Sequence, residues 1–432
     1  MTTARASGAA GRLAALLEPL FAGDLPVRLR AWDGSEAGPA DAPVVVLHTR
    51  RAVRRLLWNP GELGLAQAYV TGELDVEGDL ADGFRRVWAT IRERGVTSSG
   101  LDRAQKVQAA RTALRLGLVG PKPKTPASQA RLSGRLHTLL RDRAAISHHY
   151  DLSNDFYSLI LDPHMAYSSG YWTQEPSATY GLIDAQRDKL DLVARKLGVQ
   201  PGYRHLDIGC GWGSLSLHLA EQYGAQVLGV TLSKEQKAFI DARIAERGLQ
   251  DRVEIRLQDY REVPEKGFDT VSSIEMGEHV GAENYPVFTS LIASRLRDEG
   301  RVLIQQMSRR DRPGGGDFIE AYIAPDMHMR PVGETVALIE DAGLEVRDVH
   351  AMREHYVTTV DAWYQTFEAN WDRAVAMVGE EVARVWRLYL VGGGLVFEEG
   401  RMGVDQVLAV KRTPGGRSGF PLTREGTDLP VR

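Results

Sequence analysis

One segment of the chain, HLDIGCGWGSLSLHLA at residues 205–220, constrains the fold more than any other. An apolar run ends in Asp207, three glycines follow at alternate positions, and a second apolar run begins near Ser214. Glycine lets a backbone turn sharply and approach a ligand closely, because it has no side chain and adopts positive φ angles readily. The segment is therefore typical of a strand that turns into a helix at the carboxyl edge of a parallel sheet, where α/β proteins bind ligands.

Apolar segments that favour strands alternate with helical segments after this corner, with helices expected at 234–247 and 285–298. Strands separated by helices of this length predict a parallel sheet with crossover helices on both faces. The expected fold class is α/β, with a doubly wound, Rossmann-like sheet. The predicted strands are RHLDIGC, AQVLGVTL, VEIRLQD, FDTVSSIEM and GRVLIQQMS.

The segment GPKPKTPAS at 120–128 has the composition of a linker. It follows a stretch in which helix-like and strand-like segments are mixed and which holds no cluster of titratable residues. We therefore predict a smaller, mixed α/β amino-terminal domain over 1–119, a linker over 120–130 and the main domain over 131–432.

The composition of the chain indicates its expected cellular location. The sequence is 43% hydrophobic and 25% charged, as in soluble globular proteins, and no apolar run approaches the roughly 20 residues of a membrane span. No signal peptide precedes the first predicted domain. The single cysteine, Cys210, cannot form an intramolecular disulfide, so a reducing cytoplasm is the expected location.

Charge is distributed unevenly along the chain. Residues 103–147 contain ten basic residues and one acidic residue, although the whole chain has a formal net charge of −4. Such a stretch is either a solvated helical face or a surface that attracts the phosphates of nucleic acid or anionic lipid. Its first part, 104–119, can be drawn as an amphipathic helix with leucine and valine on one side.

The ends of the next two predicted strands narrow the class of ligand. The second strand ends in Thr231, Leu232 and Ser233, and not in the acidic residue that holds the ribose of NAD. The third ends in Asp259 and Tyr260, which suit the amino group and the ring face of adenine. No lysine occupies the first glycine loop, so a P-loop nucleotide site is not expected.

At these motifs the chain resembles the class I S-adenosylmethionine-dependent methyltransferases and, more narrowly, the cyclopropane fatty acid synthase family. The matching segments lie at 148–172, 206–220, 229–236, 257–262, 273–281 and 362–371. The amino-terminal segment LGLAQAYVTGELDVEGDL resembles the accessory domain of the longer bacterial synthases. Within the family, the chain is most similar to the actinobacterial enzymes that methylenate the tenth carbon of an oleoyl chain on the way to 10-methyl, tuberculostearic-type fatty acids.

The resemblance implies an S-adenosylmethionine site along the three strand ends. Taken singly, most of its residues would be ordinary packing or turn residues, but their joint occurrence in order favours the cofactor site. The implied cofactor residues are Tyr150, Tyr167, Ser168, Asp207, Gly209, Gly211, Thr231, Leu232, Gln236, Asp259 and Tyr260.

The resemblance further implies methyl transfer to the cis double bond of an acyl chain. The carbocation left by this step must be shielded from water, which calls for an apolar, partly aromatic channel. On spacing alone, a core stripe would be the more common explanation of the aromatic residues in the 362–371 segment. The candidate lining residues are Tyr171, Trp172, Trp363, Tyr364, Phe367 and Trp371.

The proton acceptor is left open by the sequence. In the cyclopropane-forming relatives a bicarbonate is held by a cysteine backbone, a glutamate, a histidine and a tyrosine. This chain keeps the glutamate, as Glu278, and the tyrosine, as Tyr389. Ser169 replaces the cysteine, and Gln305 replaces the histidine. Glutamine carries no proton near neutral pH. A second carboxylate, Glu275, lies three residues before Glu278 and could supply the base directly if burial raises the pKa of one of the two. The alternative is a solvated pair, which is more common for acidic residues in loops.

These departures favour a hydride shift before deprotonation, which gives an exocyclic methylene; the alternative is a cyclopropane ring at the same double bond. Reduction to the methyl branch would need a separate flavin- or nicotinamide-dependent reductase, because the chain has no second dinucleotide fingerprint. We expect the substrate to be a phospholipid acyl chain, met from the cytoplasm at the inner face of the cell membrane through the basic stretch.

No nucleic acid partner and no metal are expected, and the oligomeric state, homo- or hetero-oligomer, is left open. Two other functions stay in view. One is a methyltransferase of small molecules or nucleic acid, and the other is a noncatalytic lipid-binding scaffold that kept the fold.

Overall fold

The computed structural model describes residues 8–21, 23–95, 103–130 and 153–423. The chain divides into two compact units, each with its own sheet. The first comprises Met1–Gln129, Gly316–Tyr322 and Gly379–Leu395, and the second comprises Ala130–Gly315, Ile323–Val378 and Val396–Arg432.

The first unit is a small mixed α/β structure, as the sequence predicts. Its sheet has the order β2-β1-β3-β4, in which β1 and β3 are parallel and the other neighbours antiparallel. Arg55, buried in this unit, donates from Nε to Glu73 Oε2 at 2.9 Å, so a helix is tied to the turn before the last strand. Its elements are α1 (Ala9–Leu17), η1 (Glu18–Phe21), β1 (Arg28–Arg30), β2 (Glu36–Ala37), β3 (Val44–Leu47), α2 (Arg50–Trp58), α3 (Glu62–Val70), β4 (Leu74–Glu77), α4 (Leu80–Glu93), α5 (Arg103–Arg115), α12 (Asp317–Tyr322) and most of α16 (Glu380–Glu398).

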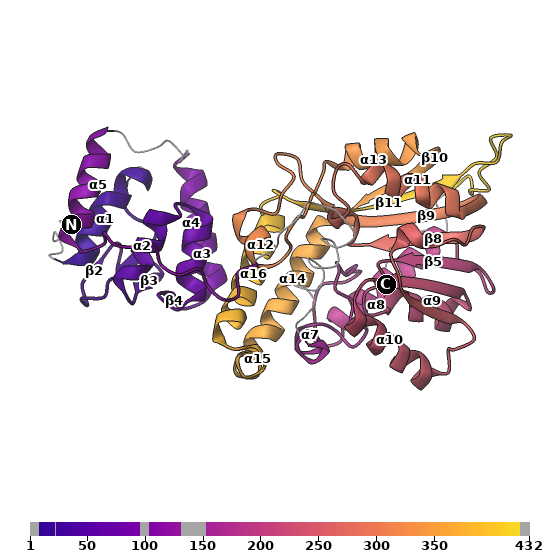
Figure 1. The fold of residues 1–432 in the computed structure, drawn as a ribbon, viewed down its shortest axis with the longest axis horizontal. Helices are drawn as coiled ribbons and strands as arrows, with labels where there is room; N and C mark the ends of the chain where they lie inside the picture. The colour runs from indigo at the N-terminus through magenta and orange to yellow at the C-terminus, as the bar shows by residue number, and fades with distance from the viewer. Residues whose placement is uncertain (1–7, 22, 96–102, 131–152, 424–432) are drawn as a thin grey trace. The chain divides into compact units, whose positions relative to one another are not determined.

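The second unit is built on a seven-stranded sheet of order β10-β11-β9-β8-β5-β6-β7, and Figure 1 shows β11, β9, β8 and β5 side by side. The five strands from β5 to β9 are parallel, and β11 is antiparallel to both of its neighbours. The strands are β5 (Arg204–Ile208), β6 (Gln226–Thr231), β7 (Val253–Leu257), β8 (Phe268–Ile274), β9 (Leu296–Ser308), β10 (Leu344–Ala351) and β11 (Gly403–Lys411). The predicted parallel sheet is confirmed, and β10 and β11 extend it by an edge that the sequence reading did not predict.

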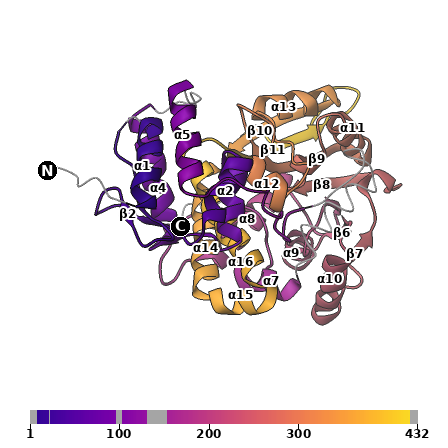
Figure 2. The same ribbon diagram turned by 60° about the vertical axis from the view of Figure 1, so that its left-hand side comes forward.

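Both faces of this sheet are buried. Val227 and Leu228, neighbours on β6, belong to different apolar clusters because adjacent residues of a strand point to opposite faces. One cluster includes side chains of α8, α9 and α10, and the other includes side chains of α11 and α13. Figure 2 shows α10 beside β6 and β7. The doubly wound α/β class is therefore confirmed.

Two helices of this unit were predicted: α10 matches the expected range 234–247, and α11 begins at 285 as expected but ends three residues before 298. The helices of this unit are α7 (Asn154–Ile160), α8 (Leu182–Leu197), α9 (Ser214–Tyr223), α10 (Lys234–Arg247), η2 (Tyr260–Glu262), η3 (Gly277–His279), α11 (Tyr285–Arg295), α13 (Val332–Asp341), α14 (Arg353–Ala369) and α15 (Trp371–Val378). Among the helices of the described ranges, none is both long and apolar enough to cross a bilayer.

The glycine-rich corner is the predicted turn between β5 and α9. Gly209, Gly211 and Gly213 have φ angles of 75°, 56° and 81°, which other residues rarely adopt. A side chain at Gly209 would also place its Cβ 2.9 Å from Met276 Cγ. At Gly211, by contrast, a Cβ would meet no described atom within 4 Å. The backbone at Gly211 therefore borders open space.

Candidate active site

A cavity lies at the carboxyl ends of β5, β6, β7 and β8, within the second unit. Every predicted cofactor residue that the structure describes lines it; Tyr150 lies outside the described residues. The predicted residues in its wall are Tyr167, Ser168, Asp207, Gly209, Gly211, Thr231, Leu232, Gln236, Asp259 and Tyr260.

Asp207 holds the first strand end in place. It is buried, and its Oδ2 accepts from Ser216 Oγ at 2.7 Å while its Oδ1 accepts from Ser272 Oγ at 2.8 Å. Burial raises the pKa of Asp207, and these two hydrogen bonds oppose the rise. Because Ser216 lies on α9 and Ser272 on β8, the carboxyl group joins three elements at the wall of the cavity.

The second strand end presents a hydrogen-bonded pair. Thr231 Oγ1 donates to Gln236 Oε1 at 2.7 Å, and both side chains are buried. Ser233 caps α10, because its Oγ accepts from the Gln236 backbone N–H at 3.2 Å. Hydroxyl and amide groups held in this way suit the hydroxyls of a ribose.

The third strand end presents a fixed carboxylate. Arg261 donates from Nε to Asp259 Oδ1 at 2.8 Å and from Nη2 to Oδ2 at 2.7 Å, although Asp259 itself is buried. The Tyr260 ring, which also lines the cavity, packs edge-on against Phe288 with centroids 5.5 Å apart. A carboxylate held in place beside an aromatic ring suits the amino group and the face of adenine. Arg261 was not predicted as a site residue, although its position directly after Asp259 and Tyr260 in the sequence could have indicated it.

Lys189 is a cavity residue that the sequence reading missed. It lies on α8, it is buried, and its Nζ donates to Ser168 Oγ at 2.9 Å. Burial lowers its pKa to about 8, while the negative charges of Asp162, Glu275 and Asp207 oppose this change. On sequence alone it is one more lysine in an amphipathic helix, so only its burial distinguishes it.

Two carboxyl groups follow β8, of which Glu275 lines this cavity and Glu278 is buried behind its wall. Glu275 lines the cavity and accepts at Oε1 from Gln305 Nε2 at 2.9 Å. Glu278 is fully buried, and its Oε1 accepts from the Met307 backbone N–H at 3.3 Å. Burial raises the pKa of Glu275, and raises that of Glu278 well above the ordinary value because Glu275 adds its negative charge. The alternative of a solvated acidic pair is therefore wrong for Glu278, whereas Glu275 is partly accessible from the cavity that it lines.

Ser169 joins this group through its backbone. The Ser169 backbone N–H hydrogen-bonds to the Glu275 carboxyl, while the hydroxyl donates to the Gly170 carbonyl at 2.9 Å. The structure thus brings together four of the five predicted catalytic residues. Tyr389, the fifth, is on the part of α16 that belongs to the first unit, and its role stays a prediction.

The predicted aromatic lining is adjacent to the cavity at one point. Tyr167, in the cavity wall, packs against Trp363 of α14 with ring centroids 5.4 Å apart, and Trp363 is buried. Trp172 donates from Nε1 to Thr359 Oγ1 at 3.0 Å. None of the six predicted lining residues is among the described residues that line the cavity itself, so the acyl channel stays a prediction.

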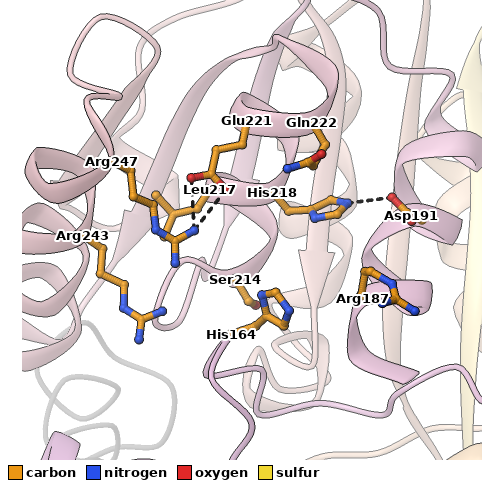
Figure 3. A pocket seen from close by; sticks show the side chains of 10 residues that line it. All are labelled: His164, Arg187, Asp191, Ser214, Leu217, His218, Glu221, Gln222, Arg243 and Arg247. Atoms are coloured by element: carbon orange, nitrogen blue, oxygen red, sulfur yellow. Dashed lines mark hydrogen bonds and ion pairs between the residues drawn. The ribbon is translucent and has the colours of Figure 1, made fainter. Parts of the chain in front are cut away.

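A second cavity, of about 220 Å³, lies between α8, α9 and α10 and holds none of the predicted site residues. Figure 3 shows that several of its charged side chains are paired with each other. Arg247 pairs with Glu221 at 3.0 Å, and His218 with Asp191 at 2.8 Å. It has no aromatic wall for adenine among its lining residues. The strand-end cavity is thus the better site for a nucleoside.

The strand-end cavity fits S-adenosylmethionine, the cofactor that the resemblance implies. It combines a fixed carboxylate and a ring for adenine, hydroxyl and amide groups for the ribose, and open backbone at Gly211. The first turn of α9, at Ser214, also lines it, and the positive end of a helix dipole favours the carboxylate of a methionyl group.

Comparisons with known proteins agree with this assignment. The sequence model of the mycolic acid cyclopropane synthetase family matches residues 137–407. The chain is 37% identical over 434 residues to a probable fatty acid methyltransferase of Mycobacterium tuberculosis, with 98% of this chain and 99% of the relative covered. It is 32% identical over 407 residues to the tuberculostearic acid methyltransferase of the same organism, with 90% and 89% covered. A crystal structure of a mycolic acid cyclopropane synthase complexed with SAH and CTAB has 31% identity and a TM-score of 0.58, over 62% of this chain and 97% of that one.

Proposed function

Because the chain belongs to the mycolic acid cyclopropane synthetase family, we propose that it methylates the cis double bond of an oleoyl chain in a phospholipid and gives a 10-methylene product. The chain is an S-adenosylmethionine-dependent enzyme of fatty acyl modification. The observation that carries the proposal is the strand-end cavity, in which Glu275 lies in one wall with every cofactor residue that the structure describes. The 10-methylene chain would be the precursor of a 10-methyl, tuberculostearic-type fatty acid, made by a separate reductase.

In this reaction the main contribution of the protein is to position the two reactants. S-adenosylmethionine supplies an electrophilic methyl group when bound. An isolated alkene is a weak nucleophile, so the residues of the cavity must hold both reactants in line, which can supply several kcal/mol of the barrier. Bond formation at C10 leaves a cation at C9. A hydride then moves from C10 to C9, and loss of a proton from the added methyl group completes the exocyclic double bond.

The methylene product, and not a ring, is supported by two observations. Gln305 stands where the ring-forming relatives have a histidine, and its amide is already engaged with Glu275. The tuberculostearic acid methyltransferase of M. tuberculosis is similar to this chain over 90% of its length. We therefore place the branch point after methyl transfer, at the fate of the cation.

We extend the proposal to an anionic membrane as the place where the substrate is met. On the first unit, Trp58 donates from Nε1 to the Gly120 carbonyl at 3.2 Å, so α2 lies beside the segment that follows α5. Exposed apolar side chains of α2, α5 and the segment after α5 include Leu57, Trp58, Leu114 and Val119. Exposed basic residues of the same segments are Arg111, Arg115 and Lys122. We call this set the α2–α5 surface.

The mixture of cations and exposed apolar side chains suits the headgroup region of an anionic bilayer, where each well-placed cation adds about 1 kcal/mol. The predicted amphipathic helix is shorter than expected, because α5 ends at Arg115. Within it Val107 and Leu114, seven residues apart, share an exposed face, whereas Ala113 is buried on another. Residues 131–147 of the basic stretch lie outside the described residues.

Product identification tests the function. Expression of the chain alone in a host rich in oleate should give a phospholipid acyl chain heavier by one CH2, which takes up hydrogen under mild hydrogenation. A variant with Asp259→Ala should lose the product, because the carboxylate at the third strand end is gone, whereas Glu283→Gln, an exposed residue of the loop after η3, should keep it. An isomeric product inert to hydrogenation would be a ring and would refute the methylene proposal.

A further inference from the structure

We infer that the Glu275 carboxylate is itself the base that takes the proton from the methylated acyl chain, in the place that the resemblance assigns to bicarbonate in the cyclopropane-forming relatives. The inference rests on the proposed function and names the residue that ends its reaction. It is carried by four observations: the donors around Glu275, the amide chain behind Gln305, the backbone at Glu275, and the pairing with Glu278.

Of the four groups that the resemblance assigns to bicarbonate, three contact the Glu275 carboxyl: those of Ser169, Glu278 and Gln305. Gln305 Nε2 donates to Glu275 Oε1 at 2.9 Å, and the Ser169 backbone N–H and the Glu278 carboxyl also hydrogen-bond to the Glu275 carboxyl. A bicarbonate in their midst would add a further negative charge beside two buried carboxyl groups, which a low-dielectric site disfavours. Bicarbonate therefore does not fit this site.

Gln305 is also hydrogen-bonded to its neighbour across the sheet. Gln305 of β9 and Gln406 of β11 face each other in the strand register, and Gln406 Nε2 donates to Gln305 Oε1 at 2.9 Å. Both side chains are buried. Because the Gln305 oxygen is used as an acceptor, its NH2 group is the one that faces Glu275. The amide chain thus presents a donor to Glu275, as a charged carboxylate requires.

The backbone at Glu275 is held in an unfavourable conformation. Its φ is 53°, and it is one of four non-glycine residues with positive φ among the described residues. Its N–H donates to the Gln305 carbonyl at 2.7 Å, which keeps this conformation in place. Glycine would adopt it without strain. Strained residues that persist cluster at functional sites, so the side chain at this position has a use that glycine could not serve.

Glu278 completes a pair in which one proton is shared. The hydrogen bond between the two carboxyl groups requires that one of them carries a proton, and Oε2 of each group is buried with no hydrogen-bond donor among the described residues. Burial raises the pKa of both groups, but more for Glu278, while Gln305, Glu278, Lys189 and Ser169 all favour the charged form of Glu275. Glu275 accepts from Gln305 Nε2 at 2.9 Å, whereas Glu278 accepts from the Met307 N–H at 3.3 Å, so the donors favour the negative charge on Glu275 and leave the shared proton on Glu278.

The step balances with these groups alone. The cation on the acyl chain loses a proton from its added methyl group to a Glu275 oxygen, and the electron pair of that C–H bond becomes the second bond of the exocyclic methylene. The positive charge of the acyl chain and the negative charge of Glu275 are both neutralised. The carboxyl pair then holds two protons, one of which must return to solvent before the next turnover.

The test uses Glu275→Gly in the full-length chain with oleoyl phospholipid vesicles. Glycine removes the carboxyl group but accepts the positive φ, so folding should be retained and S-adenosylmethionine should bind in calorimetry as in the wild type. Turnover should fall by about 100-fold or more, as for loss of a general base. Added formate should restore part of it by entering the space that the carboxyl group leaves. Glu283→Gln is the matched control and should keep wild-type turnover.

Three results would overturn the inference. Glu275→Gly could retain wild-type turnover, or the isosteric Glu275→Gln could do so. The wild type could also lose turnover in bicarbonate-free buffer and regain it when bicarbonate is added, which would make the dissolved anion the base. If the wild type gives no methylated lipid at all, the proposed function itself fails, and this outcome is distinct from the other three.

Discussion

Alanine substitutions at Gly209 and Gly211 should have different effects, although both residues lie in one turn with positive φ angles. A left-handed conformation costs a non-glycine residue about 1–2 kcal/mol, partly offset by about 0.4–1 kcal/mol because alanine restricts the unfolded chain. At Gly209 the new Cβ also lies 2.9 Å from Met276 Cγ, and overpacking adds about 1–3 kcal/mol. We expect Gly209→Ala to lower the free energy of unfolding by about 2–3 kcal/mol, and Gly211→Ala by about 1 kcal/mol.

The substitution that costs less stability, Gly211→Ala, should be the one that weakens cofactor binding. The Cβ of Gly211→Ala meets no described protein atom within 4 Å and enters the cavity instead, so the dissociation constant for S-adenosylmethionine should rise by about tenfold or more, equal to about 1.4 kcal/mol. Gly248→Ala is the matched control, because Gly248 has a φ of 66° and open space at its Cβ but lies after α10, away from the cavity. Urea unfolding and calorimetry measure the two quantities. If Gly211→Ala binds the cofactor as tightly as Gly248→Ala, this cavity does not hold the methyl donor.

Two further predictions concern charge. Burial lowers the Lys189 pKa from 10.5 to about 8, so the unfolded chain binds this proton more tightly than the folded chain. The free energy of unfolding should therefore rise with pH between about 8 and 10.5, by at most about 3 kcal/mol. Urea titrations of Lys189→Met should lack this rise, and a pH profile identical to that of the wild type would contradict the assignment. Charge reversal at Arg111 and Arg115 should weaken pelleting with anionic vesicles by about fivefold or more per residue at low salt, at about 1 kcal/mol per cation lost, and pelleting that is indifferent to lipid charge would count against the α2–α5 surface.

Much of the second unit could be predicted because its signals are local. The glycine corner and the alternation of apolar strands with helices follow from residues that are close in sequence, and α10 begins and ends where it was expected. The β10–β11 edge was not predicted, because an antiparallel pair joined through α14, α15 and α16 leaves no short-range signal. Likewise, a reading of the chain in order does not reveal that residues 316–322 and 379–395 are compact with the first unit.

The site shows the same limit in chemical terms. The types of residue at the strand ends indicated an adenosine-containing ligand, since each end has its own polar group. The state of Glu275 could not be predicted, because its burial depends on Gln305, Gln406 and Ser169, which come from distant parts of the chain. Lys189 was missed for the same reason.

The fate of two deuterium atoms tests the account most directly. An oleoyl phospholipid deuterated at C9 and C10 would be incubated with the purified enzyme and S-adenosylmethionine, and the product examined by NMR and mass spectrometry. A hydride shift from C10 to C9 followed by loss of a methyl proton predicts both deuterium atoms on C9 and an undeuterated methylene on C10. One deuterium on each of two ring carbons would show that the cation closes directly, and would contradict the account.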